Sequence, residues 1–227
     1  MAWAIFVHSV RQVFGNLNAA LRVSVVLMAV QFAVTMWFTG TIAEIVAAGP
    51  EADIPQGVLG PQLLAFLVVA AITGPWVAVA WHRYVLLEEH PGAAVPRWDG
   101  ARWMAYLFAL VQLFLVVLLA MVALSMVAGF VLALFPVAGA GIMVAPLLMV
   151  PIAYLGYRLS LVLPAAALGE PMTLRQSWNA TIPGANTILG LTFLVLAASL
   201  FAQVAGGALL SSSYILGMAV RIVLSWA

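Results

Sequence analysis

Three kinds of residue are missing or scarce in this chain. The sequence contains no cysteine and no lysine, and only 7% of its 227 residues are charged. Without cysteine, disulfide bonds, thiol catalysis and cysteine-ligated metals are excluded. A soluble domain carries charge on roughly a quarter of its residues, so a soluble globular class is excluded as well. The net charge of +1 gives no indication of nucleic-acid binding.

The composition that remains is that of a membrane protein. Hydrophobic residues make up 66% of the chain and the mean hydropathy is +1.18. Several apolar runs exceed the ~18 residues that indicate a transmembrane helix. The runs are continuous and do not alternate with polar residues, which excludes a transmembrane β-barrel. We therefore expect an all-α fold, a polytopic membrane helix bundle of about six spans in three hairpins.

The order of apolar and polar segments predicts a single transmembrane domain over residues 1–227. Pro146 and Pro151 predict a kink in the fourth span. Arg221 lies deep in a last span of only 17 residues, so we expect that span to be incomplete and the chain to continue past Ala227; the alternative is a short half-membrane helix that ends on a neighbouring helix. The expected segments are an interfacial helix 1–20, a hairpin 21–87, a cytoplasmic loop 88–103, a hairpin 104–163, a cytoplasmic elbow 164–185 and a hairpin 186–227.

Two short segments show the apolar periodicity of amphipathic helices that lie at a membrane surface. In residues 1–20, aromatic and aliphatic side chains recur at helical spacing opposite His8 and Arg11. In the elbow, Pro171 can begin a helix because a proline at the first helical position loses no hydrogen bond. The residues expected to contact lipid or its headgroups are Arg11, Phe14, Arg158, Arg175 and Trp178.

The distribution of arginine predicts the orientation. Seven of the eight arginines lie in or beside the N-terminal segment, the 83–103 segment and the elbow, and the loops at 49–62, 135–139 and 206–213 contain none. Basic residues concentrate on the cytoplasmic side of membrane proteins. We therefore expect a bacterial inner-membrane protein with a cytoplasmic N-terminus.

The polar segments on the predicted inner side resemble one another. The second and fourth spans end in the similar sequences WHRY (81–84) and GYRL (156–159), and an arginine–tryptophan element follows each of them. A unit of interfacial helix, span, outer turn and span, repeated three times, would explain this. The alternative is that any membrane protein places arginine and tryptophan at its inner interface.

One stretch carries a family resemblance. The sequence YRLSLVLPAAALGEPMTLRQSWNAT has an arginine at a span end (Arg158), a proline in an apolar stretch (Pro164) and an interfacial segment ending Arg-x-Ser-Trp (175–178). It resembles an uncharacterised bacterial inner-membrane superfamily that includes the membrane domain attached to some glycerophosphodiester phosphodiesterases. The phosphodiesterase barrel has no counterpart in this chain. The resemblance implies a six-span fold and a location, without a reaction.

Candidate chemical groups are few. His82, Glu88, Glu89, His90 and Asp99 could form a metal or acid–base site, but a solvated loop whose acids balance its arginines is the interpretation we favour. We predict no catalytic residue, no cofactor and no metal. Within the spans the polar side chains are Gln31, Gln112, Gln203 and Arg221. Glutamines there could line a transport path or join helices by hydrogen bonds, and we favour the second role.

These observations leave three classes of function. We expect a non-enzymatic accessory or scaffold protein that acts on lipids or on a larger membrane complex. Its partners would be membrane lipids and a larger membrane protein complex or a second copy of the chain, and nucleic acid is not expected. The alternative is a small-molecule or lipid transporter with a cavity among the proline-containing second and fourth spans. An enzyme has little support from the sequence.

Overall fold

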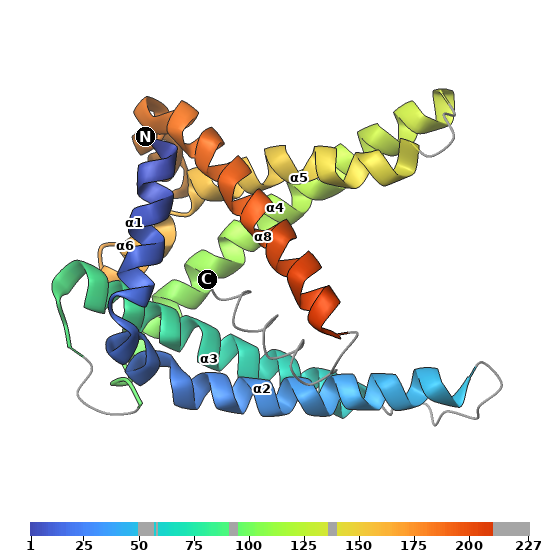
Figure 1. Cartoon of the computed structure of the whole chain (residues 1–227). Coiled ribbons are helices and arrows are strands. Elements are labelled where there is room, and N and C mark those ends of the chain that lie inside the picture. The colour runs from blue at the N-terminus through green and yellow to red at the C-terminus, as the bar shows by residue number, and fades with distance from the viewer. Residues whose placement is uncertain (50–56, 58, 91–94, 136–139, 211–227) are drawn as a thin grey trace. The chain divides into compact units, whose positions relative to one another are not determined.

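The structure, a computed structural model, describes residues 1–49, 57, 59–90, 95–135 and 140–210 (Figure 1). Within these ranges the chain is helical and contains no strand, so the all-α prediction is confirmed. The helices are α1 (Ala2–Phe14), α2 (Leu17–Ala48), α3 (Gly60–Leu87), α4 (Gly100–Leu134), α5 (Ala140–Leu159), α6 (Val162–Leu168), α7 (Leu174–Ala180) and α8 (Ala185–Leu210), with a 3-10 helix η1 (Ile182–Gly184) before α8.

Within the described residues, five helical segments are long and apolar enough to cross a membrane. They are α2, α3, α4, the stretch Leu147–Leu168 and the stretch Ile182–Gly207. Each coincides with one of the first five expected spans, while the expected sixth, with Arg221, lies outside the described residues. At 35 residues, α4 is ~52 Å long and exceeds a ~30 Å hydrocarbon core. It therefore extends beyond that core or crosses it at a tilt.

The prediction of one continuous helix over residues 1–20 is wrong. Helix α1 ends at Phe14 and α2 begins at Leu17, so the last residues of the expected interfacial helix belong to the first span. Gly15 makes the turn, and its N–H donates to the carbonyl of Arg11 at 2.7 Å. A Cβ at Gly15 would lie 2.7 Å from that same carbonyl oxygen, so only glycine fits. The apolar periodicity runs on across the turn, which is why it did not reveal the break.

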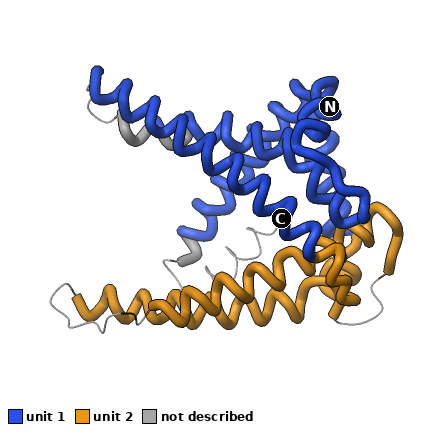
Figure 2. Tube along the Cα trace, turned by 180° about the vertical axis from the view of Figure 1, so that it is seen from behind, with its two compact units in different colours: residues 1–15, 104–227 blue, residues 16–103 orange. Residues whose placement is uncertain are grey.

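The chain divides into two compact units, shown separately coloured in Figure 2. One consists of Asn16–Trp103, and the other of Met1–Gly15 together with Met104–Ala227. In the Asn16–Trp103 unit, α2 and α3 pack side by side over much of their length. The Phe38 and Phe66 rings stack at 5.6 Å, and the Tyr84 hydroxyl donates to the Asn16 side chain at 3.0 Å. The beginning of α2 thus lies beside the end of α3, and a later residue of α2 meets an earlier residue of α3, so the two helices are antiparallel.

The contact surface of α2 and α3 is narrow and made of medium and small residues. The buried residues of α2 lie four positions apart, as one face of a helix requires. They are Val23, Leu27 and Gln31, and the buried residues of α3 are Thr73, Pro75 and Val79.

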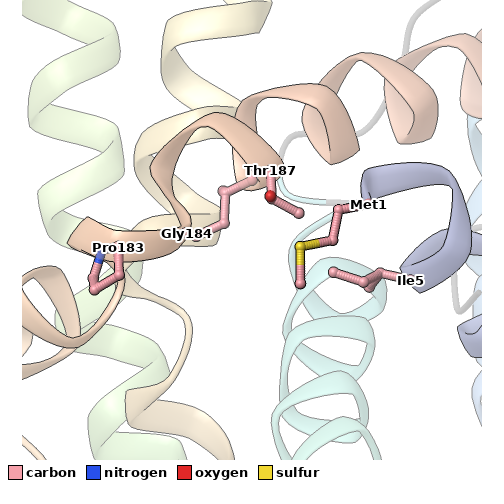
Figure 3. A pocket seen from close by; sticks show the side chains of 6 residues that line it. Met1, Ile5, Pro183, Gly184 and Thr187 are labelled. Carbon is pink, nitrogen blue, oxygen red and sulfur yellow. The ribbon is translucent and has the colours of Figure 1, made fainter.

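The other unit centres on α5, α7 and α8. Helix α8 contacts both α1 and α5. The approach of α1 depends on two small residues, because a Cβ built on Gly190 would lie 3.0 Å from the Cβ of Ala2. Beside this contact is a shallow, mainly apolar depression of about 370 Å³ (Figure 3), lined by Met1, Ile5, Pro183, Gly184, Thr187 and Ile188.

Most of the large apolar side chains of the spans are exposed in this structure. Leu119 on α4 is 68% exposed and Phe201 on α8 is 76% exposed. Of the α4 residues, only Tyr106 is buried. In water such surfaces would lead to aggregation, whereas in a bilayer the acyl chains solvate them. The exposure pattern is that of a helical membrane protein.

Candidate functional site

Two buried polar residues, Ser177 and Thr181, lie in the elbow, and the local sequence explains its path. Helix α6 ends at Leu168 and is capped by Gly169, whose φ of 86° is left-handed and favours glycine. Helix α7 begins only after Thr173. The Thr173 hydroxyl accepts from the Gln176 N–H at 3.2 Å, and the Gln176 side chain accepts from the Thr173 N–H at 2.8 Å. These reciprocal bonds form a capping box.

The predicted start of the elbow helix at Pro171 is therefore wrong. Pro171 lies outside α7, and the apolar stretch before it stays helical as α6 up to Leu168. The Thr-x-x-Gln pattern at 173–176 is a sequence signal of a helix start. It marks the start of α7. The preference for proline at the first helical position, which the prediction used, is a weaker signal of a helix start than this capping box.

Arg158 lies just before the elbow, in the last turn of α5, and its side chain bonds to elbow residues. Only 5% of Arg158 is exposed. Its Nε donates to the Thr181 hydroxyl at 2.8 Å, its Nη1 to the Tyr154 hydroxyl at 3.1 Å and its Nη2 to the Trp178 carbonyl at 2.8 Å. Three different groups are thus held by the planar fork of one guanidinium, a geometry that lysine cannot reproduce.

Aromatic rings and backbone bonds complete this arrangement. The guanidinium carbon of Arg158 lies 3.8 Å from the centre of the Trp178 ring, a cation–π contact. The carbonyl of Arg158 accepts from the Ser177 hydroxyl at 2.9 Å and from the Thr181 hydroxyl at 3.3 Å. We call the set Tyr154, Arg158, Ser177, Trp178 and Thr181 the Arg158 cluster.

The Arg158 cluster holds a buried positive charge with neutral groups. Among the described residues, the ion pairs join Arg83 to Glu89 and Arg102 to Asp99, and none involves Arg158. A buried charge is costly unless hydrogen bonds satisfy it. Hydroxyls, a carbonyl and an indole ring do so here. The cluster therefore acts as a clamp that joins the end of α5 to α7.

A second set of polar bonds lies in the other unit, where α3 ends. Arg83 Nε and Nη2 donate to the two carboxylate oxygens of Glu89, each at 2.5 Å. This bidentate bond lowers the pKa of Glu89 below its ordinary value. Glu88, with a left-handed φ of 56°, caps the helix, and its carbonyl lies 2.7 Å from Nδ1 of His90.

The beginning of α4 is stabilised in a related way. Asp99 accepts from the Arg102 backbone N–H at 3.1 Å, and its other oxygen forms an ion pair with the Arg102 side chain. The backbone bond is the main reason that the pKa of Asp99 lies below its ordinary value. Glu89 and Asp99 thus balance arginines of this segment, as the favoured interpretation of the loop predicts. Within the described part of the chain, no three histidine, aspartate or glutamate side chains are placed to share a metal ion.

Tryptophans tie the same segment to the middle of α3. The rings of Trp76 and Trp98 meet edge to face at 4.8 Å, and Trp98 lies 5.3 Å from Trp103. The Trp103 indole N–H donates to the carbonyl of Ile72 at 3.1 Å. Pro75 has no backbone N–H to donate to the carbonyl of Ala71, the residue before Ile72. The indole bond therefore supports α3 next to the place where its own hydrogen bonding is interrupted.

The predicted site residues fall into different environments. Arg11, Phe14 and Arg175 are exposed and Trp178 is 37% exposed. Arg158, expected to contact lipid, is instead enclosed by protein. Gln31 is buried and its side-chain oxygen accepts from the Thr73 hydroxyl at 3.1 Å, which joins α2 to α3. The remaining two glutamines, Gln112 and Gln203, are exposed, and Arg221 lies outside the described residues.

Sequence reasoning missed Ser177, Thr181 and Tyr154, the partners of Arg158. Ser177 has no exposed surface and Thr181 is 8% exposed. The signal available was their spacing, because positions 177 and 181 share one face of a helix. A small hydroxyl residue has many roles, so the spacing by itself did not indicate a partner for an arginine twenty residues away.

The five apolar spans of the described residues, with the arginine-containing segments that follow α3 and α5, define a polytopic helical membrane protein. A scan against protein-family models, a search of curated proteins and a search of solved structures each found no match.

Proposed function

We propose that the protein is a non-enzymatic accessory or scaffold protein of a bacterial inner membrane, which acts on lipids or within a larger membrane complex. The observation that carries the proposal is that the arginines at the ends of α3 and α5 form structural hydrogen bonds within the chain. Arg83 and Arg158 each bond to the segment that follows their helix. These groups stabilise the connections, and the apolar surfaces of the spans remain available for lipids and partner helices.

The family resemblance and the arginine distribution support the same proposal and add its orientation. The N-terminus, the 88–103 connection and the elbow would face the cytoplasm. Arg11 and Arg175, both exposed, would face lipid phosphates or acidic groups of a partner. The engagement of Gln31 by Thr73 supports a structural role for that glutamine in place of a lining role in a transport path.

The composition of the native assembly tests the proposed role. The protein is purified from its own membranes in a mild detergent, and copurifying proteins and lipids are identified by mass spectrometry. We expect a protein subunit or a lipid species retained in a fixed ratio to the chain. Solute uptake by the purified protein alone, reconstituted in liposomes and absent from empty liposomes, would overturn the proposal in favour of a transporter.

Cysteine labelling tests the orientation without background, because the chain has no cysteine. Val95 and Glu170 are exposed residues of the 88–103 connection and the elbow. Val95→Cys and Glu170→Cys should resist an impermeant thiol reagent added outside intact cells and react after the cells are opened. Ala52→Cys should react from outside. Ala167 is unsuitable as a probe because none of its surface is exposed. External labelling of Val95→Cys would contradict the orientation.

A further inference from the structure

One side of α1 packs against protein. Ala2 and Phe6, four residues apart, are half-buried. A Cβ built on Gly190, the sixth residue of α8, would lie 3.0 Å from the Cβ of Ala2. From this contact the two helices diverge (Figure 1). Helix α1 is therefore held at its first residues by the beginning of α8, and its other end leads directly into α2 at Leu17.

A second side of α1 carries large apolar residues that the described part of the chain leaves uncovered. Trp3, Val10 and Phe14 are 64%, 40% and 64% exposed, and their spacings of seven and four place them in one row. We call these three residues the α1 stripe. Arg11 borders it, three residues before Phe14. The Arg11 side chain is exposed and makes no hydrogen bond or ion pair with any residue that the structure describes.

The beginnings of α2 and α8 lie on the same side of the membrane. Between them are four segments long and apolar enough to cross: α2 itself, α3, α4 and the stretch Leu147–Leu168. An even number of crossings returns the chain to the side that it left. Helix α1 joins these two beginnings, and its 13 residues give a length of ~20 Å, too short for a ~30 Å core. It therefore lies along the membrane surface.

We propose that α1 binds the lipid surface at which α2 and α8 begin, with the α1 stripe among the upper acyl chains and Arg11 on the phosphates of anionic headgroups. Tryptophan is favoured at this boundary, and helices of this kind bury one apolar face in it. This contact deepens the proposed action on lipids and rests on it for the membrane location. It does not depend on the accessory role, because a transporter could carry the same surface helix.

The charge of the segment favours anionic lipid as the partner. The first 43 residues of the chain contain no aspartate and no glutamate, so no carboxylate of this segment repels a phosphate. A guanidinium presents a planar fork of donors that matches phosphate oxygens. Arg11 stands at the edge of the α1 stripe, where the headgroups begin once Phe14 is among the acyl chains. The apolar row and the unpaired arginine are thus satisfied together by one phospholipid surface.

Spin labels measure which side of α1 the lipid covers. The chain has no cysteine, so Val10→Cys and Phe14→Cys each place one label on the α1 stripe of the full chain in vesicles of phosphatidylglycerol and phosphatidylcholine. Ala4→Cys and His8→Cys are matched controls, since both residues are exposed, at the same spacing of four, on another side of α1. The stripe labels should be relaxed more by oxygen, which dissolves in lipid, than by a water-soluble nickel complex. The control labels should show the reverse order.

Lipid-specific quenching measures the role of Arg11. A fluorophore on Val10→Cys is quenched in turn by spin-labelled phosphatidylglycerol and by phosphatidylcholine with the same label, and the ratio gives the preference for the anionic lipid. Adding Arg11→Gln should lower this preference by about 5-fold, the effect of one arginine at an anionic surface. Adding His8→Gln should leave it unchanged.

Three results would overturn the proposal. Stripe labels as accessible to the nickel complex as the control labels would show that the α1 stripe faces water. Stripe labels accessible to neither reagent would show that protein, such as a second copy of the chain, covers it. Equal quenching by the two lipids before Arg11 is changed would remove the phosphate contact. Copurification of a subunit, which tests the accessory role, is independent of all three.

Discussion

Arg158 should be the residue whose substitution most destabilises the packing of the elbow against α5. Its guanidinium makes three hydrogen bonds of 2.8–3.1 Å and a cation–π contact at 3.8 Å while only 5% of the residue is exposed. Each bond from a charged donor contributes about 1.5–3 kcal/mol, and a desolvated cation–π contact about 2 kcal/mol. The cost of burying the charge offsets a large part of that sum.

We expect Arg158→Ala to reduce the free energy of unfolding by about 3–5 kcal/mol, because two hydroxyls and a carbonyl lose their buried donor at about 1–3 kcal/mol each. Arg158→Lys keeps the charge but loses the planar fork, so at least two of the three bonds are lost. It should cost about 1–3 kcal/mol. Both variants loosen the junction of α5 with α7, and Trp178 should become more accessible to a fluorescence quencher.

Denaturant titration in mixed micelles, followed by tryptophan fluorescence, measures these differences. Arg175→Ala is the matched control, because Arg175 lies in the same elbow, is exposed, and makes no hydrogen bond or ion pair within the described part of the chain. It should change the free energy of unfolding by less than about 0.5 kcal/mol. If Arg158→Ala were no more destabilising than Arg175→Ala, the clamp would not hold the elbow and the reasoning would fail.

Three further predictions concern other contacts. A double-mutant cycle on Gln31→Leu and Thr73→Val should give a coupling of about 0.6 kcal/mol, the mean for interhelical bonds in membranes, and zero coupling would contradict the bond. Gly190→Leu should displace α1 and expose it to protease, whereas Gly129→Leu, with open space around it, should not. The pKa of Glu89 is lowered in the folded protein by its bond to Arg83. The contribution of this bond to the free energy of unfolding is therefore complete above the ordinary pKa of glutamate and is lost as the pH falls through the lowered pKa of the folded protein. The stability difference between wild type and Glu89→Gln should therefore vanish in acid; a difference that persists at all pH values would refute the assignment.

The sequence by itself determined the spans and the class of protein. A helix in lipid satisfies its own backbone, so a continuous apolar run of sufficient length is enough to place one. For this reason the expected hairpins 21–87 and 104–163 begin within four residues of the starts of α2 and α4, and the first of them ends with α3 at Leu87. Two helix starts were not predicted correctly from the sequence. The break at Gly15 depends on how closely a Cβ would approach a carbonyl, and the start at Thr173 was overlooked in favour of Pro171.

Only the tertiary structure decided what the polar residues of the spans do. Gln31 and Gln112 look equivalent in the sequence, yet one is bonded to a neighbouring helix and the other faces outward, because the side of a helix that is covered depends on what packs against it. Arg158 looked like a lipid anchor at the end of a span. Its partners Trp178 and Thr181 lie 20 and 23 residues further along the chain, and only the return of α7 against α5 turns that arginine into a buried clamp.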